Sequence, residues 1–434
     1  MKSALALLVD DESGILATLA GVLRDHGYEV VTTGSGEEAV RLYRQRRPDV
    51  VFLDVWLPDR DGLETLQTLR GFDPEAAVVM ISGHGTTATA VRAIKMGAVD
   101  YLEKPLSYDQ VIEAAAAASA GSRPARRRDD PERGAPAPRA TGEAARTPPP
   151  PLPITAAGAA QQRTLRHSTV LYGLGLHSGG RTGMVLQPLP PDSGIHFQSL
   201  PSGESIAAHL AAVADTEYAT TLAARGAQIK TVEHLLSALH AAGITNLLIK
   251  VHGEVPVLDG SAIEFCRTFA EIGVDEQDAP RRELVIDRRY AVGDQRKGIA
   301  IEPYAGFRVS YLLRYPPPIG EQFFDFELAD LETYEREIAP ARTFGFMRDL
   351  KMLNELGLGS GGRLDNFILV GEDNVVNTEL RFPDEFVRHK ILDIIGDLYL
   401  LGYPVRGKVT AKLTGHRDNI AILRKIQEAN PEPD

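Results

Sequence analysis

His389, Asp393 and Asp397 follow one another at intervals of four residues in the segment 386–398, FVRHKILDIIGDL. Residues four apart lie on one face of a helix, so these side chains are expected to point the same way. On a surface helix they would be a capping histidine and two solvated acids. An imidazole and a carboxylate one turn apart also suit two ligand positions of a tetrahedral Zn²⁺ site.

The rest of this helix favours the metal site. Its remaining positions are almost all apolar, namely Ile391, Leu392, Ile394, Ile395, Leu398, Tyr399, Leu400 and Leu401. A helix that is apolar nearly all round is buried, and buried acids must be paired or bound to metal. Cys266 is the only cysteine, so a reducing compartment is expected and any metal must use histidines and carboxylates.

The segment 230–239, KTVEHLLSAL, is the best source of a third ligand because a helix start there carries Glu233 beside His234. If His234 binds the metal, Glu233 can take a proton from a water at the open position without being a ligand. Taken alone, the pair is more readily interpreted as a helix N-terminal acid and a capping histidine. Its interpretation therefore depends on the segment 386–398.

His416 lies in a tight Thr-Gly-His loop after an expected strand at 407–413. Asp397, one turn beyond Asp393, could hydrogen-bond to His416 and raise its pKa. His416 would then stay protonated and serve as a general acid or an electrostatic stabiliser.

A second group of residues that could bind a metal or a phosphate follows apolar runs near the N-terminus. Asp10 and Asp11 end the run 4–9, and Asp54 ends the run 50–53. Carboxylates that meet at the carboxyl edge of a parallel sheet suit Mg²⁺, although any single one could be a helix cap. Ser82 ends the run 77–81 and Lys104 precedes Pro105, so a hydroxyl and an ammonium would complete a phosphate site.

The elements that position these residues divide the chain. In the first 120 residues, short apolar runs alternate with amphipathic stretches at 13–25, 36–46, 62–70 and 86–96, which predicts a doubly wound α/β domain with a parallel sheet. Residues 121–162 are rich in Pro, Ala and Arg and are expected to be a linker rather than a basic patch for nucleic acid. Residues 163–434 mix short strands, turns and long helices, as in α+β folds.

Composition agrees with two or more folded domains. The 434 residues include 47 basic and 59 acidic side chains, for a net charge of −12, and 43% are hydrophobic. This balance excludes a wholly disordered chain and gives no support to nucleic-acid binding. The run 4–9 is too short for a signal peptide, and no apolar stretch approaches the ~20 residues of a transmembrane helix, so a cytoplasmic protein is expected.

Residues 3–120 resemble the receiver domain of two-component response regulators, on the motifs VDDE, FLDVWLPDRDG, ISGHG and DYLEKP and on five expected parallel strands. The resemblance implies that Asp54 accepts a phosphoryl group from a sensor histidine kinase. It also implies Mg²⁺ held by Asp10, Asp11 and Asp54, and a cis Lys104–Pro105 peptide. The switch residues would be Lys104, which pairs with the phosphate, Ser82, which turns toward it, and Tyr101, which reports the change on the outer face.

Residues 163–425 resemble the UDP-3-O-acyl-N-acetylglucosamine deacetylase family of lipid A biosynthesis, on the motifs GLGLHSG, TVEH, PVLDGSA, ARTFGFMRD, FVRHKILDIIGDL and TGH. The resemblance implies two α+β sandwich domains, 163–280 and 281–434, with zinc at their interface. It implies His234, His389 and Asp393 as zinc ligands. Glu233 would be the general base, and His416, oriented by Asp397, the general acid.

The same resemblance assigns residues to the substrate. Thr343 would stabilise the oxyanion, Lys390 would contact the substrate, Phe344 and Phe346 would lie near the sugar and acyl chain, and His177 would lie near the metal. Residues 350–369 occupy the place of the insert that lines the acyl channel in this family. A core-facing helix with a glycine-rich end is an equally good interpretation.

The leading hypothesis is a cytoplasmic zinc amidase that acts on UDP-3-O-acyl-N-acetylglucosamine and responds to phosphorylation of Asp54. The deacetylase family normally lacks a receiver domain, so the purpose of the fusion follows from neither resemblance alone. A receiver-containing adaptor that only binds ligand remains an alternative, as does a deacetylase of another N-acetylated sugar.

Overall fold

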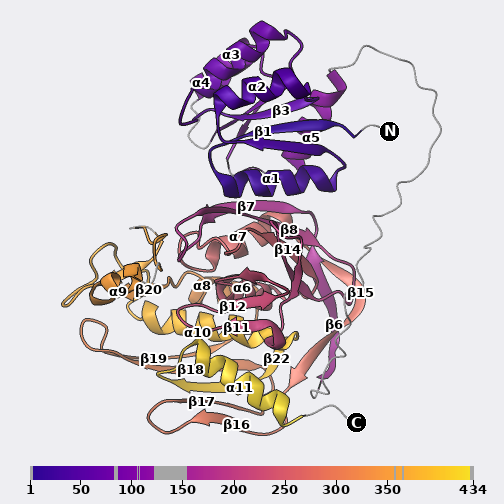
Figure 1. Ribbon diagram of the computed structural model, residues 1–434. Coiled ribbons are helices and arrows are strands. Elements are labelled where there is room, and N and C mark those ends of the chain that lie inside the picture. The colour runs from indigo at the N-terminus through magenta and orange to yellow at the C-terminus, as the bar shows by residue number, and fades with distance from the viewer. Residues whose placement is uncertain are drawn as a thin grey trace.

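The computed structural model describes residues 3–82, 87–104, 106, 108–121, 154–355, 358–363 and 366–430. The N-terminal α/β domain lies on one side of a larger α+β body, and its helix α1 (Ser13–Asp25) faces that body (Figure 1). Within the described ranges, no helix is long and apolar enough to cross a membrane.

The N-terminal domain is a doubly wound α/β unit, as predicted. Its five parallel strands run in the order β2-β1-β3-β4-β5, with β1 at Leu5–Val9, β2 at Glu29–Thr33, β3 at Val50–Asp54, β4 at Val78–Ser82 and β5 at Asp100–Glu103. Helices α1 and α5 (Tyr108–Gly121) pack in one apolar cluster with the sheet. Helices α2 (Gly36–Arg46), α3 (Gly62–Phe72) and α4 (Thr87–Lys95) pack in another. Strands β1, β3 and β4 are continuous apolar runs because both sheet faces are covered.

The linker ends earlier than its composition predicted. Strand β6 (Ile154–Leu165) begins inside the range 121–162 and pairs antiparallel with β15 (Val274–Val285), with Ile154 opposite Leu284. Its Ala- and Gln-rich sequence lacks the apolar alternation of a half-buried strand, so pairing with β15 decides its structure. Residues 122–153 lie outside the described part of the chain.

A mixed sheet forms the first layer of the larger body. Its strand order is β10-β9-β14-β8-β7, with β7 at Thr169–Leu174, β8 at Arg181–Pro188, β9 at Ile195–Ser199, β10 at Ser205–Ala207 and β14 at Leu247–Val251. A small sheet holds β11 (Val213–Asp215), β12 (Thr221–Ala224) and β13 (Ala227–Ile229). Helices α6 (Glu233–Ala242) and α7 (Ile263–Ile272) supply the helical layer.

A second sheet runs in the order β16-β17-β22-β15-β6, and β18 joins it by pairing with β22 and with β19. These strands are β16 (Tyr290–Gly293), β17 (Gly298–Glu302), β18 (Phe307–Arg314), β19 (Glu321–Glu327) and β22 (Val405–Lys412). The remaining elements are α8 (Leu331–Glu337), β20 (Phe344–Phe346), α9 (Leu350–Glu355), β21 (Ile368–Val370), α10 (Glu385–Leu398) and α11 (His416–Glu428). The α+β class is as predicted, but β15 runs through the expected division at 280/281.

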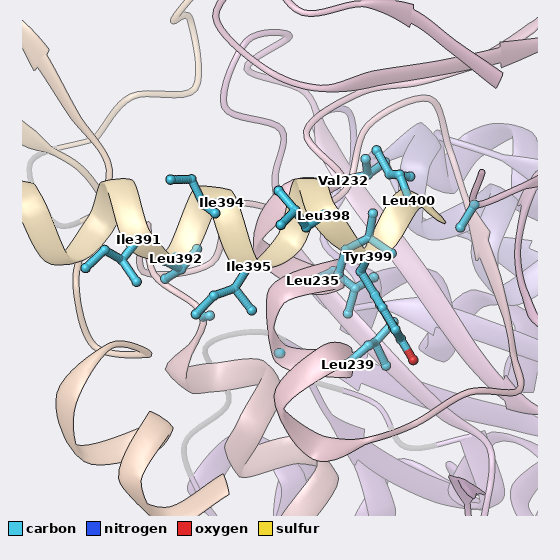
Figure 2. Close-up of a cluster of buried hydrophobic side chains, with 14 of the residues drawn as sticks. Val232, Leu235, Leu239, Ile391, Leu392, Ile394, Ile395, Leu398, Tyr399 and Leu400 are labelled. Atoms are coloured by element: carbon cyan, nitrogen blue, oxygen red, sulfur yellow. The ribbon is translucent and has the colours of Figure 1, made fainter. Parts of the chain in front are cut away.

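Helices α6 and α10 cross at the centre of the larger body. Figure 2 shows Leu235 and Leu239 of α6 among the apolar side chains of α10, and all are buried in one cluster. The crossing is close because Gly396 has no side chain: a Cβ there would overlap the carbonyl group of Glu233. Glycine at this position therefore lets α10 bring its polar stripe against the start of α6.

Candidate functional site

Three predicted ligands meet at the crossing of α6 and α10. His234, His389 and Asp393 are buried, and one nitrogen or oxygen from each lies within 4.8 Å of the others. Asp393 Oδ1 lies 3.4 Å from His389 Nε2 and 3.8 Å from His234 Nε2. The two imidazole rings stand nearly perpendicular, with centroids 5.0 Å apart. This arrangement presents two nitrogens and one oxygen to a shared point.

The surroundings of these side chains fit a metal ion. His389 Nδ1 lies 3.1 Å from the carbonyl oxygen of Ala341, so Nδ1–H donates there and Nε2 is left free to coordinate. Asp393 Oδ1 is buried and makes no hydrogen bond to any residue that the structure describes. Burial lowers the pKa of His234 to about 3, which keeps its imidazole neutral, as a ligand must be. A donor set of two imidazoles and a carboxylate is typical of catalytic zinc sites.

Glu233 lies beside this cluster at the first turn of α6. Its side chain is buried, and Oε2 accepts a hydrogen bond from the backbone N–H of Thr220 at 3.1 Å. Burial raises the pKa of Glu233 to about 7, near the value that suits a group that takes and returns a proton at neutral pH. Thr231, two residues earlier, has a φ of 60°, which is strained for a β-branched residue.

His416 and Asp397 form the predicted pair. His416 Nδ1 lies 2.8 Å from Asp397 Oδ2, and its Nε2 lies 3.9 Å from Glu233 Oε1. Burial favours the neutral imidazole, but the charge of Asp397 prevails and raises the pKa of His416 to about 9. Asp397 also accepts hydrogen bonds from the Thr220 hydroxyl at 2.6 Å and the Asn419 amide at 2.9 Å. These bonds fix the carboxylate that orients His416.

The predicted substrate residues lie along one side of the cluster. Lys390 Nζ donates to Asp393 Oδ2 at 2.8 Å, and lies 5.8 Å from the ring centroid of Phe344. Phe344 stands edge-on to His389, and Phe346 follows in an aromatic group with Tyr315. The backbone N–H of Thr343 donates to Gly260 O at 2.8 Å.

His177 lies in the loop between β7 and β8. It is buried, and both ring nitrogens lack a hydrogen bond to any residue in the described ranges. Its backbone N–H donates to Glu254 Oε1 at 2.8 Å, and the N–H of Ser178 donates to Glu254 Oε2 at 2.9 Å. Glu254 thereby holds the loop that carries His177.

Sequence reasoning missed several residues that support the site: Thr220, Glu254, Ala341 and Asn419. Glu254 lies two residues before the PVLDGSA motif, a signal that could have drawn attention to it. Ala341 acts through its carbonyl group, which its residue type does not show. In the expected channel segment 350–369, α9 ends at Glu355, and residues 356–357 and 364–365 lie outside the described part.

The N-terminal domain brings together a second cluster at the carboxyl ends of β1, β3 and β5. Lys104 Nζ lies 2.8 Å from Asp10 Oδ2 and 3.2 Å from Asp54 Oδ2. Asp10, Asp11, Glu12 and Asp54 each offer an oxygen within 4.8 Å of the others. Asp54 Oδ1 is buried and has no hydrogen-bond partner within the described ranges. An orphaned carboxylate oxygen among other acids fits a divalent cation, whose charge would offset theirs.

The predicted switch residues flank this cluster. Ser82 ends β4 beside the strand of Asp54 and is buried. Tyr101 is half-buried and its hydroxyl group is enclosed, because the ring packs against the cluster under α2, α3 and α4. Pro105 lies outside the described residues, and so does the expected cis peptide that precedes it.

Residues 162–428 match the family model described as UDP-3-O-acyl N-acetylglycosamine deacetylase. The chain belongs to this deacetylase family. Among curated relatives, the UDP-3-O-acyl-N-acetylglucosamine deacetylase of Myxococcus xanthus is 46% identical over 270 residues, which cover 61% of this chain and 86% of the relative. The corresponding enzyme of Thermodesulfovibrio yellowstonii is 41% identical over 269 residues, covering 62% and 92% of the two chains.

Outside the deacetylase region, residues 6–116 match the response regulator receiver domain model. The crystal structure of the receiver domain of NtrX from Brucella abortus is 44% identical, covers 26% of this chain and 98% of its own, and has a TM-score of 0.26. By the two model matches, this member of the deacetylase family carries a receiver domain ahead of its deacetylase region.

Proposed function

We propose that this chain hydrolyses the N-acetyl group of UDP-3-O-acyl-N-acetylglucosamine, with Zn²⁺ held by His234, His389 and Asp393. The observation that carries the proposal is the convergence of these buried donors with Glu233 and His416 at one helix crossing. The relatives' names supply the substrate, and the family match makes the same chemistry the expectation here. When bound, Zn²⁺ would acidify a water molecule and polarise the amide carbonyl.

The residues of this chain divide the proton transfers. Glu233 accepts a proton from the attacking water, whose oxygen bonds to the amide carbon. The Thr343 hydroxyl donates to the oxygen that becomes negative in the tetrahedral intermediate. His416, protonated because Asp397 raises its pKa, gives a proton to the leaving nitrogen. The C–N bond then breaks, and the products are acetate and a free glucosamine amine.

The remaining side chains place the substrate. Lys390 is a cation beside Phe344, so together they offer a charged contact and an aromatic surface to the sugar. Phe346 and Tyr315 extend this aromatic surface toward the acyl chain. Both ring nitrogens of His177 lack a partner among the residues that the structure describes, which suits this side chain to a hydrogen bond with substrate.

We also propose that Asp54 accepts a phosphoryl group from a sensor histidine kinase, with Mg²⁺ at Asp10, Asp11 and Asp54. The bond from phosphorus to the kinase imidazole breaks as the bond to an Asp54 carboxylate oxygen forms. Lys104 would pair with the new phosphoryl oxygens, Ser82 would turn toward them, and Tyr101 would report the change. The phosphorylation state would modulate deacetylation.

Two product measurements test these proposals. Purified zinc-loaded chain should release acetate and a free amine in equal amounts from UDP-3-O-acyl-N-acetylglucosamine, and UDP-N-acetylglucosamine without the acyl chain should compete poorly. Turnover of UDP-N-acetylglucosamine alone would contradict the proposed substrate.

For the receiver, a small phosphodonor should add an acid- and base-labile phosphate to wild type and none to Asp54→Asn. Equal labelling of both would remove Asp54 from this role.

A further inference from the structure

Helix α1 has two buried faces. Ile15 and Leu19 belong to the apolar cluster of the receiver sheet, whereas Gly14, Thr18 and Gly21 face the deacetylase region. Val170 of β7 and Val185 of β8 are buried in the same cluster as α1. Figure 1 shows α1 lying along β7 and β8, so the receiver contacts the deacetylase through this helix.

Small residues on both sides make the contact close. A Cβ at Gly14 would overlap the carbonyl oxygen of Arg181, at the start of β8. A Cβ at Gly183 would overlap the side chain of Thr18. Gly21 lies next on the same face, where a Cβ would meet Leu200 at 3.0 Å. Helix α1 therefore fits β8 at two positions, Gly14 and Thr18, and Leu200, which follows β9, at Gly21.

Opposite charges meet at both ends of this contact. Glu12, just before α1, pairs with Arg181. Asp25, the last residue of α1, pairs with Lys250 of β14. The side chain of Lys250 is only 9% exposed, so this ammonium is covered by the receiver. Steric fit and charge thus both match α1 to this face of the deacetylase.

Glu12 also belongs to the phosphoacceptor cluster. Its Oε1 pairs with Arg181 and lies 3.6 Å from Lys104 Nζ. The backbone N–H of Glu12 donates to Asp10 Oδ1 at 2.9 Å. The Glu12 carboxylate is therefore shared between two cations. Lys104, in the receiver, also contacts Asp54, and Arg181 lies on the deacetylase side of the contact.

Arg181 connects this contact to the catalytic region. It directly follows the loop 175–180, which carries His177 and is held by Glu254. The N–H of Gly175 donates to Gly180 O at 2.9 Å, which closes the loop just before Arg181. Within the same loop, Leu176 O accepts a hydrogen bond from the backbone N–H of Gly361 at 3.0 Å. Arg181 is thus the residue next to the closed loop that presents His177.

We propose that α1 docks the receiver on β7, β8 and β14, and that loading of the Asp54 pocket releases this docking through Glu12. The inference rests on the proposed function, in which Asp54 is loaded with Mg²⁺ and a phosphoryl group. A divalent cation among Asp10, Asp11 and Asp54 attracts the Glu12 carboxylate and competes with Arg181 for it. Lys104, drawn toward the phosphoryl group, no longer holds Glu12 in its present position.

Zero-length carbodiimide cross-linking of the full chain measures docking, because it joins a carboxylate to an amine in direct contact. The Asp25–Lys250 cross-link reports the interface, and the Lys297–Asp418 pair, at 3.1 Å within the deacetylase, is the internal control. Beryllofluoride with Mg²⁺ serves as the phosphoryl mimic. Adding the mimic should lower the yield of the Asp25–Lys250 cross-link by about two- to five-fold, which corresponds to the free energy of one partly exposed ion pair. The yield of the control cross-link should not change.

Three variants separate the parts of the proposal. Gly183→Val should lower the Asp25–Lys250 yield without the mimic, and an unchanged yield would overturn the docking surface. Glu12→Gln should keep the Asp25–Lys250 cross-link, but its yield should no longer fall when the mimic is added. A fall as large as in wild type would overturn the role of Glu12. Asp54→Asn should also show no response. Folding of each variant is checked by thermal unfolding and by the control cross-link.

Failure of the inference is distinguishable from failure of the proposed function. Fluorine NMR shows whether beryllofluoride binds the wild-type chain and not Asp54→Asn. Binding with an unchanged cross-link would overturn release of the receiver and leave the phosphoacceptor proposal standing. Absence of binding would overturn both.

Discussion

The Asp397 carboxylate lies 2.8 Å from His416 Nδ1, and it also accepts hydrogen bonds from Thr220 and Asn419. A buried acid with three donors is held in one orientation, so it fixes both the direction and the charge of the imidazole. The general acid of the proposed reaction is therefore set up by residues from α10, α11 and the segment before β12.

Asp397→Asn should shift the alkaline limb of the pH–rate profile. In the proposed reaction His416 acts in its protonated form, so activity should fall as pH rises through its pKa, which Asp397 raises to about 9. Without that charge the pKa falls, and the limb should move to lower pH. Profiles of kcat/KM for wild type and the variant measure the shift, and superimposable alkaline limbs would contradict the assignment of His416.

Removal of metal should destabilise wild type and leave His234→Ala almost unaffected. Asp393 Oδ1 is buried and makes no hydrogen bond to a residue in the described ranges, so the proposed site would bind the ion in the folded chain and not in the unfolded chain. At a zinc concentration a thousand times its Kd, binding adds about 4 kcal/mol to the free energy of unfolding. Thermal unfolding with and without a chelator measures this, and an equal loss in the variant would argue against His234 as a ligand.

Gly396→Ala should destabilise the deacetylase region by about 1–3 kcal/mol, the usual cost of overpacking. The added methyl group overlaps the carbonyl of Glu233, so α10 must move away from α6. Zinc affinity should fall as well, because the ligands come from both helices. Gly71→Ala in α3 is the matched control, since, apart from the helix's own neighbouring backbone, a Cβ there would meet no atom of the described residues within 4 Å. Equal stability of the two variants would show that the crossing tolerates a side chain.

The part of the site that lies on α10 could be predicted because the spacing of its residues within one helix is visible in the sequence. His389, Asp393 and Asp397 share a helix, and their spacing alone places them on one face. The meeting of α6 with α10 depends on Gly396, whose role appears only when Glu233 lies against it. Glu254 was missed because it acts through backbone N–H groups of His177 and Ser178, which no side-chain motif records.

The fold was predicted where apolar patterning is strong. The receiver strands β1, β3 and β4 are continuous apolar runs, and the structure confirms them. Strand β6 was assigned to the linker because its Ala- and Gln-rich sequence has no such pattern, and only pairing with β15 reveals it. The docking of α1 could not be predicted, since Gly14 meets Arg181 and Thr18 meets Gly183 across a long separation in sequence.

The most direct test of the proposed deacetylation compares zinc-loaded wild type with Glu233→Gln. The measured quantity is acetate release from UDP-3-O-acyl-N-acetylglucosamine. The variant should retain zinc, because Glu233 is not a ligand, and should lose about 10²- to 10⁴-fold in kcat, the contribution of a positioned general base. Such a loss with full zinc content is the result that the account predicts. Equal turnover by the two proteins, or no acetate from folded, zinc-loaded wild type, would contradict it.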